Sequence, residues 1–461
     1  MTRTPRGRVL TLALVGLAIR LAYVLTVRWG GPLSGDGVYY HEAANLLADG
    51  LGFTEPYRYL HGGAQEALFL DDPSTLVPTA NTALPVGHVE PTAGHPPLWV
   101  IVLGAVSFLG FNSVGAHQLV AAMVGALGVV AVGWAGRQVE QSTGVVGVAM
   151  PAAALAAIYA GFWLNDAQLM SETLVVPLAA LLLGCGLRFV GRPALDTAVL
   201  LGLVGGLAAL TRAELLIALP LVALGVLRTR LAADGPSGRR RLGLFALVGA
   251  TAVVVVSPWV VRNLVVFEEP VLLSNGTGIL LAQANCDATY FGDKQGYWEY
   301  HCGLPQPLDD DGEPIEESQR DAAYRQRGLD YLTDHPGRLV THVVPKRVGR
   351  YWGAYAPIQQ LRADELVEER PFRLSVFGYA QFLAVAGLAI VGIAEVRRRR
   401  GPLLLLATLP LTGTVVAAAT FGSTRYRVPA EVALVLLAAV GIAALVARRR
   451  TPDETATPTL G

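Results

Sequence analysis

Long apolar runs separated by two extended polar segments dominate the chain. A helix of about 17–22 apolar residues is long enough to cross the hydrocarbon core of a bilayer. The apolar runs, two of them shorter than the rest, predict ten membrane spans: 9–28, 114–135, 144–163, 172–190, 195–211, 214–228, 242–262, 374–396, 402–421 and 430–447. Acids and histidines gather instead in the polar segments 29–95 and 263–372.

A further apolar segment, 97–111, is short, and the arginines decide how it is interpreted. As a helix it covers only about 22 Å, less than the ~30 Å hydrocarbon core. Cytoplasmic loops are enriched in Lys and Arg. If 97–111 does not cross, the following arginines join the N-terminal ones on the cytoplasmic side: Arg137, Arg188, Arg192 and those in 228–241, 397–400 and 448–450. We therefore predict an interfacial or re-entrant helix at 97–111, with both termini inside and both polar segments outside.

The composition supports a membrane protein, whereas the balanced net charge says nothing about nucleic acid, and we expect no nucleic-acid partner. Of 461 residues, 52% are hydrophobic and only 16% charged, and 36 Lys and Arg balance 36 Asp and Glu. A soluble domain carries about 25% charged residues. We expect an all-α polytopic membrane protein with about ten transmembrane helices, juxtamembrane helices in the first outer loop and a small mixed outer cap. The expected parts are a catalytic core at 1–262 with outer loop 29–95, an extracytoplasmic cap at 263–372, C-terminal spans at 373–450 and a disordered tail at 451–461.

The first outer loop opens with an acid between two glycines, Gly35-Asp36-Gly37, followed by an amphipathic run. Glycines allow backbone conformations that other residues resist, so the carboxylate could be turned toward a cavity at the membrane edge. Alternatively, Asp36 is simply the N-cap of the helix that follows. The spacing alone leaves both interpretations open.

Six stretches form a set that runs in order through most of the membrane part: "GDGVYYHEAANLLADGLGF", "GHPPLWVIVLG", "LNDAQLMSETLVVPLAALLL", "LTRAELLIALP", "SPWVVRNLVVF" and "STRYRVPAE". Each is weak alone. Together they resemble the C-type glycosyltransferase superfamily, most closely its protein O-mannosyltransferase and lipid A aminoarabinose transferase branch. In such families the acid of the first outer loop is the catalytic base, and the resemblance implies that role for Asp36.

The resemblance also implies a second acid at the start of a span and a basic residue near the donor phosphate. Glu172 is the best match for the second acid, with Asp166 in reserve, although acids are favoured at helix N-termini in any protein. His95 matches the basic position. Relatives carry an acid just before it, where this chain has Gly94, and Glu90 is close enough to substitute.

Arginines near the outer ends of the spans are candidates for binding a lipid phosphate. Guanidinium groups hold phosphate oxygens through paired donors. The resemblance favours Arg425 or Arg427, with Arg212 and Arg262 as weaker candidates. The alternative is arginines whose charged ends reach the lipid headgroups.

Cofactor and disulfide expectations follow from the remaining residues. Cys286 and Cys302 flank part of the second polar segment and predict a disulfide if that segment faces an oxidising compartment; the alternative is two unrelated thiols. No regular zinc-ligand spacing is present. Superfamily members that use diphosphate donors need a divalent ion, but we favour no catalytic metal and no other cofactor.

These features predict an inverting glycosyltransferase of the plasma membrane with an extracytoplasmic active site. It would move a hexosyl or pentosyl unit from a polyprenyl-phosphate donor to a hydroxyl of a glycan, lipid or protein acceptor, with membrane lipids as its surroundings. Two alternatives from other classes are a lipid-linked sugar flippase or export protein and a non-catalytic envelope sensor. The shortage of charged residues inside the spans argues against a transport path.

Overall fold

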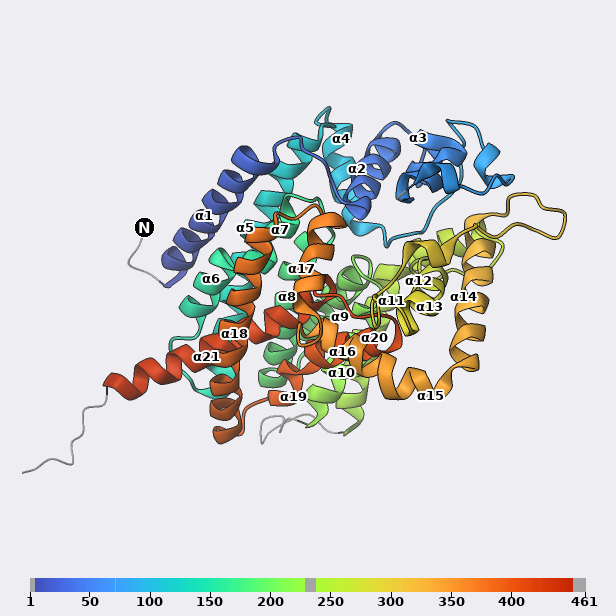
Figure 1. The fold of residues 1–461 in the computed structure, drawn as a ribbon. Coiled ribbons are helices and arrows are strands. Elements are labelled where there is room, and N and C mark those ends of the chain that lie inside the picture. The colour runs from blue at the N-terminus through green and yellow to red at the C-terminus, as the bar shows by residue number, and fades with distance from the viewer. Residues whose placement is uncertain (1–4, 71, 229–237, 451–461) are drawn as a thin grey trace, which may run out of the picture.

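The computed structural model describes residues 5–70, 72–228 and 238–450, so the tail predicted at 451–461 lies outside the described residues. The chain is helical, as expected (Figure 1). Within the described residues, six helices are long and apolar enough to cross a membrane. They are α1 (Pro5–Tyr23, continued by the π-helical turn η1, Val24–Arg28), α5 (Val114–Thr143), α8 (Glu172–Gly191), α11 (Gly238–Val266), α18 (Phe372–Arg398) and α21 (Val428–Arg450).

Shorter apolar helices coincide with the four remaining predicted spans. These are α6 (Ala149–Ile158) with α7 (Ala160–Asp166), α9 (Leu195–Ala209), α10 (Leu215–Arg228), and α19 (Leu403–Leu406) with α20 (Thr408–Ala419). The segment 97–111 forms α4 (Leu98–Phe108), whose 11 residues cover only about 16 Å. An interfacial or re-entrant position for α4, and the number of ten crossings, stay predictions.

The apolar core joins α5, α6, α8, α9, α18 and α21, and small residues let these helices approach closely. Helix α18 crosses α21 at two glycines. A Cβ atom at Gly392 would lie 1.8 Å from the carbonyl oxygen of Leu437, and one at Gly441 would lie 2.4 Å from that of Leu388. The start of α21 is therefore held in a fixed position by a tightly packed helix pair.

The polar segment 29–95, called the first outer loop after its predicted side of the membrane, contains several short helices. It holds α2 (Gly35–Ala48), α3 (Pro56–His61) and the 3₁₀ turns η2 (Gly62–Phe69), η3 (Pro73–Thr75) and η4 (Asn81–Ala83). Helix α2 packs on α4, where Trp99 and Leu103 are fully buried against it. The indole Nε1 of Trp99 donates to the carbonyl of Leu169 (2.6 Å), which ties α4 to the segment before α8. The loop helix is thus fixed against the membrane part rather than free in solvent.

The second polar segment folds into a small helical cap beside the first outer loop (Figure 1). The cap was expected to be mixed, but the only extended pairing in its described residues is an isolated bridge between Leu308 and Pro314. Its elements are α12 (Thr277–Ala284), α13 (Asp287–Tyr290), η5 (Tyr300–Gly303), α14 (Glu317–Asp334), α15 (Pro336–Arg338), η6 (Leu339–Val343), α16 (Val344–Tyr351) and α17 (Pro357–Leu366). The predicted Cys286–Cys302 disulfide is confirmed and joins the end of α12 to η5.

Candidate active site

Asp36 lies in the first turn of α2, but it does not cap this helix. The N-cap is Ser34, whose Oγ accepts from the backbone N–H of Gly37 (3.3 Å). Gly37 is helical, so an unusual backbone conformation is not the reason for a glycine there. A Cβ atom at Gly37 would lie 2.3 Å from the carbonyl oxygen of Gln168, so the glycine allows α2 to approach the segment before α8. The Asp36 side chain is left available for contacts across the molecule.

Arg425, in the 3₁₀ turn η7 (Arg425–Arg427) before α21, connects three carboxylates. Its Nη2 donates to Asp36, its Nε to Glu172 at 3.1 Å and its Nη1 to Glu368 at 2.9 Å. The guanidinium is 10% exposed, while Glu172 and Glu368 are almost completely buried and Asp36 is 29% exposed. Residues 389 positions apart in the chain therefore meet in one charged cluster.

Arg212 is the second guanidinium of this cluster. Its Nη1 donates to the same Oε1 of Glu172 (2.7 Å), and its Nε donates to Glu214. Its guanidinium also lies over the Tyr426 ring, 4.4 Å from the centroid, and that of Arg425 lies 5.0 Å from the same centroid. Glu172, as the first residue of α8, thus bridges two arginines from different parts of the chain.

His95 lies beside Asp36. Its Nε2 lies 3.7 Å from Oδ1 of Asp36, and its ring packs against those of Tyr39 and Tyr40 at centroid distances of 4.6 and 4.9 Å. Burial lowers the pKa of His95, and the nearby Asp36 carboxylate offsets this only in part. His95 is therefore neutral near pH 7 and offers a hydrogen bond rather than a full charge.

The surroundings shift the pKa values of Asp36 and Glu368 in opposite directions. Burial alone would raise the pKa of Asp36, but Arg425, His95 and Arg212 outweigh it and lower that pKa to about 2. For Glu368 burial dominates over Arg425, and its pKa is raised. As long as Arg425 contacts Asp36, this carboxylate is a weak base.

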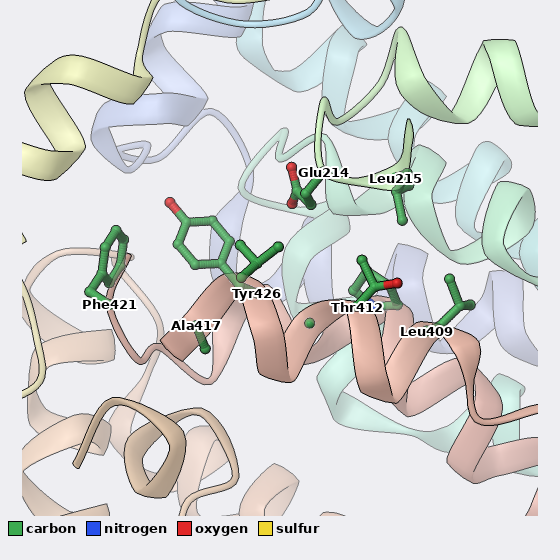
Figure 2. Close-up of a pocket in the computed structure, with 10 residues that line it drawn as sticks. Glu214, Leu215, Leu409, Thr412, Ala417, Phe421 and Tyr426 are labelled. Carbon is green, nitrogen blue, oxygen red and sulfur yellow. The ribbon is translucent and has the colours of Figure 1, made fainter. Parts of the chain in front are cut away.

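An apolar crevice ends at this cluster (Figure 2). It lies between the start of α10 and α20, with Glu214, Leu215, Leu409, Thr412 and Ala417 on its walls, and Tyr426 at one end. Its volume of about 20 Å³ leaves room for about one water molecule. The crevice connects the apolar surfaces of α10 and α20 with the ring that both arginines contact.

Two of the candidate residues lie away from the cluster. The Nε of Arg427 donates to Glu431 (2.7 Å) and its Nη1 to the carbonyl of Tyr351 (3.1 Å). Asp166, the reserve for Glu172, pairs with Arg20 at 2.6 Å inside the helix bundle. The structure therefore does not bring Asp166 or Arg427 into the cluster around Arg425.

Glu90 and Arg262 also lie outside the cluster. Glu90 pairs with Arg58 (3.0 Å) and Arg320 (2.8 Å), so it links the outer loop to the cap. Arg262 donates to the carbonyl of Thr92 (3.0 Å) and holds the chain that leads to His95. Both positions stabilise the loop that carries the site.

Sequence reasoning missed Glu368 as a member of the site. The residue lies in "LVEERPF", directly before α18. An acid directly before an apolar span is the same signal that led to Glu172 at the start of α8. The signal was present, but the resemblance had no counterpart for it.

Solved structures of another protein share the fold of this chain. The chain superposes on the oligosaccharyltransferase of Archaeoglobus fulgidus in its apo form with a TM-score of 0.55 and 14% identity, over 96% of this chain and 50% of that one. The same archaeal enzyme, AglB, in complex with an inhibitory peptide and a dolichol-phosphate gives a TM-score of 0.54 and 13% identity over 96% and 50%.

The chain shares its fold with part of this archaeal oligosaccharyltransferase. It spans about half the length of the archaeal oligosaccharyltransferase. A scan against protein-family models finds no match, and a search of curated proteins finds none either. At this level of identity the likeness establishes the fold, as the resemblance predicted, and leaves the reaction to be argued from the site.

A third structure of the archaeal enzyme, with a TM-score of 0.52 and 15% identity over 96% of this chain and 51% of that one, is a complex with Zn and sulfate. The residues of the present cluster do not fit a metal ion. The position between Asp36, Glu172 and Glu368, where a cation would lie, is taken by the guanidinium of Arg425. No group of three or more His, Cys, Asp or Glu side chains suited to a metal is found in residues 5–70, 72–228 and 238–450.

Proposed function

We propose that this protein is an inverting glycosyltransferase that moves a sugar from a polyprenyl-phosphate donor to an acceptor hydroxyl at the extracytoplasmic surface. The observation that carries the proposal is the contact between Asp36 and Arg425. A candidate base and a phosphate-binding guanidinium from opposite ends of the chain lie in one cluster. The fold supports the proposal, since it is shared with an enzyme that has been solved with a dolichol-phosphate.

The donor's phosphate would bind at Arg425 and Arg212, and its lipid chain would leave along the crevice below Tyr426. The crevice is too small for an isoprene chain, so α10 and α20 must separate when the donor enters. The walls are apolar apart from Glu214 and Thr412, which suits a hydrocarbon chain. A membrane-borne donor also removes the need for a nucleotide site on this side of the membrane.

In the proposed reaction, the phosphate takes Nη2 of Arg425 away from Asp36. The released carboxylate regains basicity because the attraction that lowered its pKa now acts on the phosphate. Asp36 then removes the proton from the acceptor hydroxyl as its oxygen attacks the anomeric carbon. Arg425 and Arg212 offset the charge that grows on the departing phosphate, and His95 donates a hydrogen bond. One displacement at carbon inverts the anomeric centre.

The distribution of arginines supports the side of the membrane that we propose for the site. With both termini in the cytoplasm, the runs at 397–400 and 448–450 lie inside, as the positive-inside rule requires. The cluster around Asp36 then lies outside, at the plasma membrane. A glycan, a lipid or a protein outside the cell could supply the acceptor hydroxyl.

The test is sugar transfer by the purified protein in nanodiscs. Wild-type protein should consume polyprenyl-phosphate-linked hexose or pentose in the presence of an envelope extract as acceptor source. Asp36→Asn should lose roughly 100- to 10,000-fold in turnover, the usual contribution of a general base. Turnover of the wild-type rate by Asp36→Asn would remove Asp36 from the mechanism, and failure of the wild type to consume any such donor would refute the function.

A further inference from the structure

A second, more polar cavity lies between the first outer loop and the cap. Its volume is about 210 Å³. Glu55 and Gly94 line it from the outer loop, and Gln283, Glu317, Asp321 and Tyr324 line it from α12 and α14 of the cap. No step of the proposed reaction uses these cap residues.

The two walls of this cavity are joined by buried polar contacts. Glu90 of the outer loop pairs with Arg58 of the same loop at 3.0 Å and with Arg320 of α14 at 2.8 Å. The backbone N–H of Ala93 donates to Oε1 of Glu317 at 2.8 Å. Because breaking a buried ion pair leaves an uncompensated buried charge, these contacts hold the cavity in a defined shape.

Two polar side chains of the cap line the cavity, those of Gln283 and Tyr324. Gln283 is 7% exposed and Tyr324 is 6% exposed, so most of each residue is fixed by the surrounding chain. The Gln283 amide can donate and accept hydrogen bonds, and so can the Tyr324 hydroxyl. The cavity wall therefore offers two positioned polar groups to a bound molecule.

The charge around the cavity favours a neutral ligand rich in hydroxyl groups. Glu55, Glu317 and Asp321 line it as acceptors, while the guanidiniums of Arg58 and Arg320 are already paired with Glu90. Burial raises the pKa of Glu55 to about 7 and that of Asp321 to about 6. Three carboxyl groups in the wall disfavour an anion, whereas sugar hydroxyls can donate to them and accept from the amide and the phenol.

The cavity also shares its walls with the candidate active site. Gly94 lines the cavity, and the next residue, His95, lies 3.7 Å from Asp36. Close to Glu55, the hydroxyl of Tyr57 donates to the carbonyl of Gly35 (2.6 Å), beside Asp36. The cavity therefore lies close to Asp36, because Gly94 in its wall is followed directly by the histidine that lies beside that carboxylate.

We propose that this cavity is a subsite for a neutral sugar residue of a glycan acceptor, bound through Gln283, Tyr324 and the surrounding carboxylates. The role as an acceptor subsite rests on the proposed function. The binding of a neutral sugar by the cap does not, and it can be measured separately. The proposal narrows the acceptor to a glycan, since a peptide or a lipid lacks the dense set of hydroxyls that the cavity matches.

The experiment measures binding of a panel of methyl glycosides of neutral hexoses and pentoses, with glucuronic acid and inorganic phosphate as anionic probes. The method is saturation-transfer NMR on the full-length protein in nanodiscs. The test variant combines Tyr324→Phe with Gln283→Leu, which removes the hydroxyl and the amide that line the cavity and keeps the bulk of both side chains. Tyr331→Phe is the matched control, because Tyr331 lies on the same helix and its hydroxyl already donates to Asp287 at 2.6 Å. Asp36→Asn serves as the control for the reaction site.

At least one neutral glycoside should bind to the wild type, and the double variant should bind it roughly ten-fold more weakly, as expected for two lost hydrogen bonds. Tyr331→Phe and Asp36→Asn should bind it as the wild type does, and the anionic probes should not bind. The proposal is overturned if no neutral glycoside binds, if the double variant equals the wild type, or if only the anions bind. Donor consumption is measured in parallel. If the wild type consumes no donor but binds the sugar through these residues, the proposed function fails and the sugar site stands; if donor is consumed without sugar binding, the reverse holds.

Discussion

The ion pair between Asp36 and Arg425 leads to a prediction that a simple catalytic residue would not make. Replacing Asp36 by Asn should strengthen the binding of polyprenyl phosphate while it abolishes transfer. In the free protein the Asp36 carboxylate competes with the phosphate for Nη2 of Arg425. Asn occupies the same volume but carries no charge, so the phosphate no longer displaces an anion from the guanidinium.

The magnitude follows from the pKa of Asp36. The surroundings lower it from 3.8 to about 2. A difference of roughly 2 units corresponds to roughly 2.5 kcal/mol in favour of the ionised carboxylate. The binding free energy of the donor is reduced by up to that amount when its phosphate displaces Asp36 from Arg425. Removing the charge of Asp36 should therefore tighten donor binding by roughly 10- to 60-fold. The same coupling requires that bound phosphate raises the pKa of Asp36, because linkage is reciprocal.

The assay is displacement of a fluorescent polyprenyl phosphate from protein in nanodiscs at pH 7. Asp49→Asn is the matched control: it makes the same substitution at the exposed C-cap of the same helix, α2, and should leave the affinity unchanged. Binding by Asp36→Asn that is equal to or weaker than that of the wild type would refute the competition between carboxylate and phosphate. An equal gain in Asp49→Asn would show that only the general surface charge matters.

Three further predictions use the same protein and assays. Arg425→Lys should weaken polyprenyl phosphate binding by roughly 10- to 100-fold, because an ammonium group cannot reproduce the planar set of donors of a guanidinium. The control Arg427→Lys should change the affinity by less than about two-fold. Equal losses in the two variants would contradict the placement of the two arginines. Asp36 must be ionised to act, so activity is lost as pH falls through its pKa, and the acid limb of kcat should lie at higher pH than that of kcat/KM, since only kcat reports the donor-bound state; coincident limbs would contradict the release of Asp36 by the phosphate. The Cys286–Cys302 disulfide closes a loop with a sequence separation of 16. Its reduction should destabilise the cap by roughly 3 kcal/mol and lower the unfolding temperature of the cap without changing the affinity for polyprenyl phosphate. An unchanged unfolding temperature would contradict a stabilising role of the disulfide.

Much of this arrangement could be predicted from the sequence because charge is rare in it. An acid such as Asp36 or Glu172 at the edge of a span is conspicuous beside long apolar runs. The distribution of arginines predicts which loops lie on the cytoplasmic side. The Cys286–Cys302 pair could be proposed because both lie in one polar segment. These signals depend on local composition, which the folded chain preserves.

The directions of the side chains and their ion-pair partners could not be predicted from the sequence in the same way. Arg425 and Arg427 are two residues apart and chemically identical, and only the 3₁₀ turn before α21 sends one toward Asp36 and the other toward Glu431. Glu90 resembled an active-site acid by position, yet two arginines bind it, one of them 230 residues later in the cap. Such choices depend on which distant charge is within reach, and a linear pattern does not contain that information.

The charge balance of the cluster also implies an order of events in the proposed reaction. Four carboxylates, Asp36, Glu172, Glu214 and Glu368, surround two guanidiniums, so the free site carries an excess of negative charge. A phosphate can enter only by displacing one of the carboxylates from Arg425, and Asp36 is the most exposed of the three that hold it. The base is therefore released only when a donor is present, while Glu172 stays between both arginines and keeps them in place. An acceptor that arrives first meets a carboxylate whose pKa is about 2 and is not activated, so the donor must bind before the acceptor reacts.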